Sequence, residues 1–517
     1  MFDNEPQNRR AFLRHTGQLA LSSTTLPFML NLAAIGEAAA FNATGDDYKA
    51  LVCIFLSGGS DYANTLVPYD DTRYNDYAGI RGELAVPIDK LDATLLKPTV
   101  APKYLEASLQ PGFDLKYALH PGMTGMAKLF NDGKMAIQLN VGPLVEPITR
   151  VQFDDSKRTQ KLPPQLFSHP DQQQQWNSPS ATVENKGWGG GVGDAATDSG
   201  LNSGASSQYT CISVAGNGVY LAGNDAVQYQ LDENVGAIAI KADGAPYNTI
   251  KGALKTLIEK STGTHKLELA YNAISARSST AVASIQAALS DTTTEGIVNA
   301  AMLQNPELGN QDDRLRKQLK MVARLIQGRA KLGSPRRQVF YVELREFDLH
   351  DNLKDGVNDK KILTGQGARL TALSSALSGF QDALGKLGLT EKVTSFTASD
   401  FGRTLVVNGG GSDHGWGNHH FVVGGAVIGK TFYGTPPPIS ASNEKDTVTK
   451  TYKPQNQWHV GEGRLLPTTS VDQYAGTLAK WFGVNDAELA TIFPNLKNFG
   501  VTKNGITYSK DMGFMVA

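Results

Sequence analysis

The sequence is poor in cysteine and has no excess of charge of either sign. Cys53 and Cys211 are the only cysteines in 517 residues, so the fold cannot depend on a disulfide framework. Both lie in apolar runs, and the sequence leaves open whether they form one bridge or remain free core thiols. The 49 Lys and Arg residues balance 50 Asp and Glu residues. This balance argues against nucleic acid as a partner, because nucleic-acid binding needs clustered basic residues.

Several familiar sequence signals are also missing. The chain has no Gly-x-Ser-x-Gly elbow, no Walker-type phosphate loop and no Cys pair spaced to bind zinc. Beyond the first forty residues, no stretch has the unbroken apolar length that a membrane span needs, so no membrane span is expected in the mature chain. A hydrophobic content of 40% is ordinary for a globular protein and argues against intrinsic disorder.

The first forty residues have the pattern of an export signal. Arg9 and Arg10 precede a long, weakly apolar run that ends in Ala38-Ala39-Ala40. This order predicts a twin-arginine signal peptide over residues 1–40, cleaved after Ala40. The alternative is an amphipathic helix with an incidental arginine pair. We therefore expect a periplasmic or extracellular protein that is exported folded, with the twin-arginine translocation machinery as its partner during export.

The rest of the chain alternates between apolar runs and helical patterns. A continuous apolar run at 48–56 predicts a strand buried on both faces. Helix-then-strand pairs follow at 121–130 and 134–141, 312–330 and 337–344, and 366–387 and 393–398. This order predicts an α/β fold, with a central, mostly parallel sheet and helices on both faces. Residues 41–517 are expected to form one domain, and the Gly-, Ser- and Asn-rich segment at about 183–263 an irregular insertion that covers the sheet edge.

Acidic residues and histidines follow the predicted strands and mark a candidate metal site. Because the carboxyl ends of parallel strands share one edge of a sheet, these side chains can gather there. Carboxylates and neutral imidazoles are common metal ligands, and zinc, manganese or calcium are the expected ions. Taken singly, each residue can also be a turn cap or a buried, hydrogen-bonded side chain. The candidate ligands are Asp61, Asp348, His350, Asp400 and His414.

Three further residues are candidates for catalysis. Ser168 and His169 precede a predicted helix, whose N-terminal end favours anions, so Ser168 is a candidate nucleophile or phosphate contact. The alternative is that Ser168 caps this helix together with Asp171. Arg403 or His169 is expected to stabilise negative charge in the transition state, and the alternative for Arg403 is a structural salt bridge.

Long segments of the chain resemble one bacterial exported family. They include FLSGGSDYANTLVP, ALHPGM, LFSHPDQQQQW, GSDHGWGNHH and PTTSVDQYAGTLAKWFG. On these segments the chain resembles the Domain of Unknown Function 1501 family, which looks like a remote branch of the alkaline phosphatase and sulfatase superfamily. The resemblance implies an alkaline-phosphatase-like fold and a metal-binding role for Asp61, Asp348, His350, Asp400 and His414. Phe401 stands where phosphatases have a metal-binding histidine, and the sulfatase motif Cys-x-Pro-x-Arg is absent.

These observations lead to three functional hypotheses. The first is an exported, metal-dependent hydrolase or transferase that acts on phosphate or sulfate esters, with a small ester or a surface polymer as substrate. The second is a non-catalytic exported binding protein that retains the scaffold. The third treats His414, His419 and His420 as a single-metal site that has no substrate.

Overall fold

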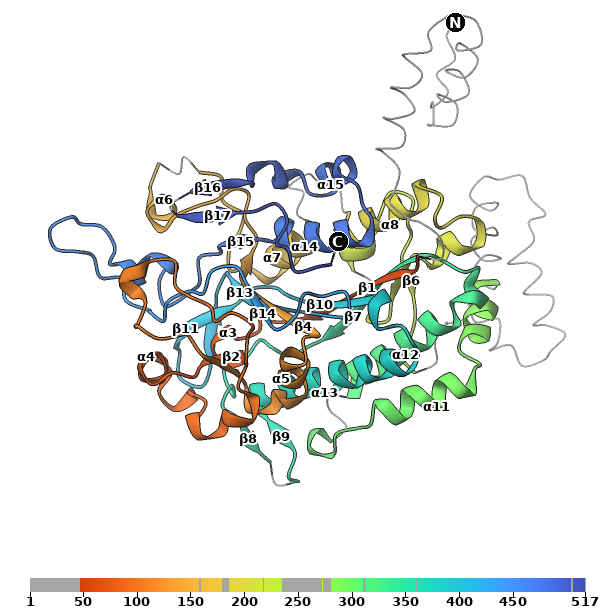
Figure 1. Ribbon diagram of the computed structural model, residues 1–517, viewed down its shortest axis with the longest axis horizontal. Helices are drawn as coiled ribbons and strands as arrows, with labels where there is room; N and C mark the ends of the chain where they lie inside the picture. The colour runs from red at the N-terminus through yellow and green to blue at the C-terminus, as the bar shows by residue number, and fades with distance from the viewer. Residues whose placement is uncertain are drawn as a thin grey trace, which may run out of the picture.

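The computed structural model describes most of the chain after the predicted signal peptide (Figure 1). The described residues are 47–157, 160–178, 186–216, 218–234, 272, 280–309, 313–358, 360–503 and 505–516. The predicted signal peptide with its cleavage site, and residues 235–263 of the predicted insertion, lie outside this part. Within the described residues, no helix combines the length and the apolar character needed to cross a bilayer.

A central sheet runs through the molecule and is mostly parallel, as the alternation of helices and strands predicted. Its order is β14-β4-β13-β10-β1-β7-β5-β6, with β15 paired to β4. All pairs are parallel except those that β13 makes with β10 and β4. The strands are β14 (Thr431–Tyr433), β4 (Met135–Gly142), β13 (Asn418–Val423), β10 (Val393–Ser399), β1 (Lys49–Leu56), β7 (Arg337–Leu344), β5 (Cys211–Ser213), β6 (Tyr229–Gln230) and β15 (Thr469–Ser470).

Helices cover both faces of this sheet (Figure 1). Successive side chains of a strand point to opposite faces, and in β1 both sets are buried. Val52 and Ile54 join one core, while Cys53 and Phe55 join the other. The first core includes residues of α5 (Thr124–Asn131), α11 (Thr292–Ala301), α12 (Asp313–Gln327) and α13 (Gly365–Lys386). The second includes residues of α7 (His169–Asn177), α8 (Trp188–Asp198), α14 (Val471–Phe482) and α15 (Asp486–Ile492).

Smaller elements complete the described structure. Three further helices follow β1 or β4, and four two-stranded sheets stand apart from the central sheet. The helices are α3 (Tyr62–Thr65), α4 (Asp71–Arg81) and α6 (Arg150–Asp154). The paired strands are β2 (Leu66–Pro68) with β3 (Tyr117–Leu119), β8 (Gly356–Val357) with β9 (Leu363–Thr364), β11 (Arg403–Val407) with β12 (Ser412–His414), and β16 (Val501–Lys503) with β17 (Ile506–Tyr508).

The two cysteines are free. Cys53 lies on β1 and Cys211 on β5, and β7 runs between these two strands. Both thiols are buried, and burial raises their pKa, which keeps them in the neutral form. They are therefore core side chains rather than a bridge.

The segment predicted as an insertion contributes to the sheet where it is described. Its residues 211–213 form β5, which pairs in parallel with β7, and residues 229–230 form β6 at the edge. Val219–Leu221 of this segment form a 3-10 turn. Its backbone packs so closely on Gly187 that a side chain there would collide with it. The apolar run around Cys211 indicates β5 in the sequence, whereas the two residues of β6 are too few to show a period.

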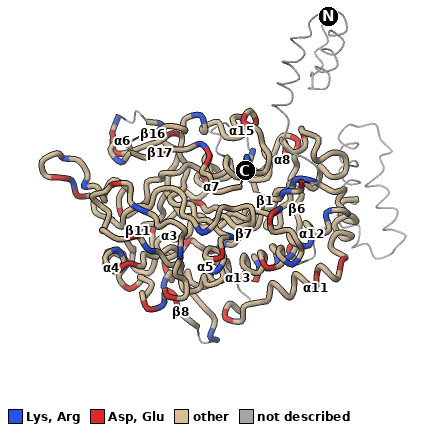
Figure 2. The backbone as a smooth tube through the Cα atoms, in the orientation of Figure 1, with Lys and Arg blue, Asp and Glu red and all other residues tan. Residues whose placement is uncertain are grey.

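Charges of both signs are interspersed over the described chain (Figure 2). Asp472, in the first turn of α14, is one of the ionisable residues that are buried instead. Burial raises its pKa to about 7, although a hydrogen bond with Asn495 opposes the shift. The folded protein therefore keeps a proton that the unfolded chain releases above about pH 4.

This burial predicts a pH-dependent stability. The contribution of Asp472 to stability is lost as the pH rises from about 4 to about 7. In this range the carboxyl group of the unfolded chain ionises in water, whereas the folded protein must keep it protonated or bury its charge. Asp472→Asn removes the titration, so we expect its stability relative to the natural chain to increase by about 3 kcal/mol between pH 5 and pH 8. Urea unfolding at both pH values measures this difference. The exposed Asp382, which pairs with Lys386, provides the control Asp382→Asn, and an equal response of both variants would contradict the assignment.

Candidate metal centre

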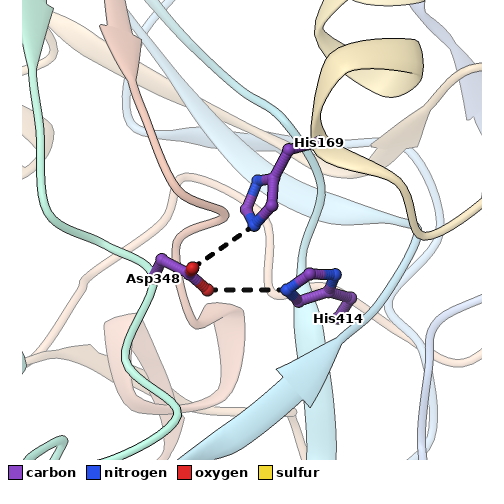
Figure 3. Close-up of side chains that lie close together, drawn as sticks. All are labelled: His169, Asp348 and His414. Carbon is purple, nitrogen blue, oxygen red and sulfur yellow. Dashed lines mark ion pairs between the residues drawn. The ribbon is translucent and has the colours of Figure 1, made fainter.

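Three histidines and one aspartate converge beside the carboxyl end of the sheet. His169 is the first residue of α7, and His414 is the last residue of β12. Asp348 and His350 lie in the loop that follows β7. Figure 3 shows His169 and His414 pointing at the carboxylate of Asp348 from two sides. One ligand atom from each of these three residues lies within 4.8 Å of the others.

The nitrogen atoms that face this centre are all Nε2. His169 Nε2 lies 3.5 Å from Asp348 Oδ2, and His414 Nε2 lies 3.5 Å from Asp348 Oδ1. His350 Nε2 lies 3.1 Å from Asp348 Oδ1 and 2.9 Å from His414 Nε2. We call His169, Asp348, His350 and His414 the metal cluster.

The other ring nitrogen of each histidine faces an oxygen atom. His169 Nδ1 lies 2.5 Å from Asp400 Oδ2, and His414 Nδ1 lies 2.8 Å from the carbonyl oxygen of Phe167. His350 Nδ1 lies 3.3 Å from Asp413 Oδ1. A carbonyl or carboxylate oxygen only accepts, so each Nδ1 carries the proton and donates. Metal-binding histidines in proteins are held in this way, which fixes the tautomer and the ring orientation.

This arrangement leaves Nε2 lone pairs that face one another. With both rings neutral, the lone pairs of His350 and His414 repel at 2.9 Å unless a cation or a proton lies between them. His169 Nε2 is buried and has no hydrogen-bond partner. A buried polar atom without a partner is costly. A divalent cation would satisfy all three nitrogens, and the Asp348 carboxylate would supply negative charge, so the donor set fits an ion such as zinc or manganese.

Neighbouring groups shift the pKa values within the cluster. The hydrogen bond to Asp400 raises the pKa of His169, against the opposing effect of burial. Burial lowers the pKa of His414, although its hydrogen bond to the Phe167 carbonyl opposes this shift. Burial by itself would raise the pKa of Asp348, but the hydrogen bond and charge of Arg403 outweigh it and lower the pKa. Asp348 therefore stays ionised, as a metal ligand must.

Unusual backbone conformations position these residues. Phe167 has φ of +71° and Glu346 has φ of +74°, a region that residues other than glycine seldom adopt. The first turn directs the Phe167 carbonyl at His414, and the second comes two residues before Asp348. Strained turns of this kind persist where the surrounding structure enforces them, and they cluster at functional sites.

Arg403 was predicted to stabilise negative charge in the transition state, and in the structure it positions Asp348. Its guanidinium is buried and donates to the carbonyl oxygens of Gly58, Gly59, Phe347 and Ser412. It also donates to Asp348 Oδ1. With these bonds it joins the turn after β1 to the loop after β7 and to β12. The guanidinium therefore orients Asp348 through an ion pair, the alternative that the sequence left open for it.

Two predicted metal ligands lie behind or apart from the metal cluster. Asp61 caps α3 by accepting from the Ala63 N–H at 3.0 Å and forms a fully buried ion pair with Arg81. Its carboxylate is thus neutralised within the fold. Asp400 is fully buried and accepts from His169 and, at 2.9 Å, from Gln173 Nε2. It orients His169, a candidate metal ligand, from behind.

Ser168 occupies the N-cap position of α7, but its side chain does not cap the helix. Its Oγ donates instead to Asp171 Oδ2 at 2.5 Å. Ser168 precedes His169 directly in the sequence, and its hydroxyl group is hydrogen-bonded to a carboxylate. That arrangement is the one a nucleophile with a neighbouring base requires.

An aromatic side chain borders the metal cluster. The ring of Phe401 packs on His169 and His414, with centroids 4.6 Å apart in both cases, and forms an apolar wall.

His419 and His420 lie on β13 rather than with His414. His419 Nδ1 accepts from the Asn140 N–H, and His420 packs on Trp176. Burial lowers the pKa of both histidines to about 3, so they remain neutral core residues.

The sequence places His169 next to Ser168, the candidate nucleophile, and did not predict His169 as a metal ligand. Asp413 and the Phe167 carbonyl, which orient two of the histidines, were not identified at all. The available signal was the position of His169, directly after a predicted turn and at the first residue of a helix. A backbone carbonyl has no side-chain signature, so the role of Phe167 could not be read from the sequence.

The geometry separates the roles of Asp400 and Asp61. Asp400→Asn leaves His169 in place but weakens its orientation, so we expect zinc affinity to fall by about 10- to 100-fold. Asp61→Asn leaves Arg81 buried without its charge partner, so we expect a loss of about 3–5 kcal/mol of unfolding free energy with zinc affinity unchanged. Competition with a chelating zinc indicator measures the affinity, and urea unfolding measures the stability. Equal losses of zinc affinity in both variants would show that Asp61 belongs to the centre.

The sequence was also compared with known proteins. A family model described as "Protein of unknown function (DUF1501)" matches residues 48–452, a span that contains the whole metal cluster. No curated protein and no solved structure gave a match. Because the match covers more than half of the chain, this protein belongs to the DUF1501 family.

Proposed function

We propose that this protein is a metal-dependent hydrolase of phosphate or sulfate esters that works with one divalent ion. The observation that carries the proposal is the convergence of three Nε2 lone pairs on the Asp348 carboxylate, with each Nδ1 held by an oxygen atom. The side chain of Asp348 is 45% exposed, so the centre is open to a substrate from solvent. A divalent ion bound there supplies a Lewis acid that draws electron density from a phosphoryl or sulfuryl group.

In this proposal Ser168 is the nucleophile. Its Oγ attacks phosphorus or sulfur while its proton passes to Asp171, the carboxylate to which it is bonded. Asp171 then returns the proton to the departing alcohol as the ester bond breaks. The N-terminal end of α7 stabilises the anionic group on Ser168, and water releases that group in a second step.

We also propose that the sheet is a remote relative of the alkaline phosphatase and sulfatase fold. Support comes from the mostly parallel sheet with helices on both faces and from ligands in the loops after its strands. A single ion, rather than two, suits the residues at hand. Asp61 is paired with Arg81, Asp400 is bonded to His169, and Phe401 cannot coordinate.

The second candidate function is an exported protein that binds a ligand without chemistry. The observation that favours it is Phe401, whose ring packs on both His169 and His414 and leaves one side of the centre apolar. In that case the ion has a structural or ligand-holding role, and Ser168 is dispensable.

Metal content and ester hydrolysis test the two candidates together. We expect about one zinc or manganese ion per chain and hydrolysis of p-nitrophenyl phosphate or p-nitrophenyl sulfate. Asp348→Asn and His414→Ala should lose both the ion and the activity, because each removes a ligand. Ser168→Ala should keep the ion and lose activity by about 1,000-fold or more. Elemental analysis and the release of nitrophenol are the measurements.

Asp351→Asn is the matched control for Asp348→Asn, since Asp351 lies in the same loop and is exposed. It should change neither metal content nor activity. An ion that binds without hydrolysis of any phosphate or sulfate ester would favour the binding protein. Absence of metal after incubation with excess zinc and manganese would contradict both.

We further propose that the protein is exported by the twin-arginine route. The signal at residues 1–40 supports this proposal. The expected N-terminus of the exported protein is Phe41, and N-terminal sequencing of periplasmic material checks it. Changing Arg9 and Arg10 together to lysine should retain the protein in the cytoplasm, whereas changing Arg14 to lysine should not. An exported chain that still begins at Met1 would contradict the predicted cleavage.

A further inference from the structure

A cavity apart from the metal cluster lies between the N-terminal half of α13 and the segments around α5 and residues 83–90. Its volume is about 610 Å³, within the range of about 300–1,000 Å³ found for small-molecule sites. None of the residues of the metal cluster lines it. The segment 345–355 connects the two sites, since it carries Asp348 and ends with Lys354 and Asp355 in the wall of this cavity. We call this cavity the α13 cavity.

Small hydroxyl side chains form one wall of the α13 cavity. Thr371, Ser374, Ser375 and Ser378 line it from α13, at spacings that place them on one face of a helix. Thr124 faces them from α5. In the part of the chain that the structure describes, the hydroxyl groups of Thr124 and Ser375 have no hydrogen-bond partner within the protein. They are available to donate to a ligand and to accept from it.

A carboxylate is held rigidly at the same wall. Asp355 Oδ1 accepts from the Gly367 N–H at 2.7 Å, in the first turn of α13. Its Oδ2 lies 2.5 Å from Nε2 of the buried His120. His120 Nδ1 accepts from the Gly122 N–H at 3.1 Å, so Nε2 carries the proton and donates to Asp355. The carboxylate is thus oriented by two other segments, yet its side chain is 44% exposed. A fixed acceptor of this kind binds a ligand without first losing conformational freedom.

The charges around the cavity nearly cancel. Glu83, Glu307 and Asp355 stand against Lys90 and Lys354, and Lys354 pairs with Glu83 at 3.1 Å. Such a lining offers donors and acceptors in close alternation but no excess of positive charge to bind an anion. Apolar surface from Leu84, Pro121 and Leu363 lies between these groups.

We propose that the α13 cavity binds a neutral saccharide of about two or three sugar units. Sugar hydroxyl groups both donate and accept, as do the side chains of α13, and Asp355 accepts from a hydroxyl pair. The apolar side chains meet the C–H faces of the sugar rings. The inference does not depend on ester hydrolysis, because the cavity shares no residue with the metal cluster.

Titration calorimetry on the purified mature chain tests this inference. The probes are neutral linear trisaccharides of glucose, mannose, galactose and N-acetylglucosamine, each up to about 10 mM. We expect at least one of them to bind. Ser375→Phe should abolish binding by filling the cavity, and Asp355→Asn should weaken it by about tenfold through loss of a charge-assisted hydrogen bond. Circular dichroism checks that both variants fold.

Ser290→Phe is the control, since Ser290 is exposed and does not line the cavity. It should leave saccharide binding unchanged, and Asp348→Asn should also leave it unchanged. The inference is overturned if no neutral trisaccharide binds, or if Ser375→Phe binds as well as the natural chain. Binding of only a trigalacturonate or a trialanine probe would also overturn it, in favour of an anionic or peptide ligand.

Discussion

The buried guanidinium of Arg403 is the interaction on which the metal cluster depends. A buried cation must be surrounded by acceptors, and Arg403 finds them in the turn after β1, in the loop after β7 and in β12. Close approach of these segments requires Gly58 and Gly59, since a side chain at either position would collide with the loop that bears Asp348 or with the ring of Phe401. The same guanidinium also lowers the pKa of Asp348. One side chain thereby fixes both the position and the charge of the central carboxylate.

The histidines depend on a second set of contacts that lies behind them. Asp400, Asp413 and the Phe167 carbonyl each accept from an Nδ1 atom, so the Nε2 atoms face inward before any ion is bound. Ligands oriented in advance lose little conformational freedom when a metal binds. The apolar ring of Phe401 closes one side of the centre, and Asp61 is neutralised by Arg81. These contacts together support the proposal of one ion rather than two.

The segment 345–355 links this centre to the α13 cavity. It begins with strained backbone at Glu346, carries Asp348 and His350, and ends with Asp355 bonded to α13 and to His120. Both sites are therefore set by the connection between β7 and α13. A parallel sheet places such connections at its carboxyl edge, which explains why chemistry-bearing residues distant in sequence meet here.

The sequence by itself determined the class of fold and the segments that bear the chemistry. The continuous apolar run of β1 and the helical pattern of α13 predicted their elements closely, because burial selects apolar residues along the length of each element. It also singled out Asp348, His350 and His414, since these polar residues follow strands or turns. Only the tertiary structure assigned the roles. Partners far apart in the chain turned Asp61 into an ion pair, made Arg403 a positioning residue and brought His169 to the centre. These outcomes depend on which groups are buried together, and no local pattern records that.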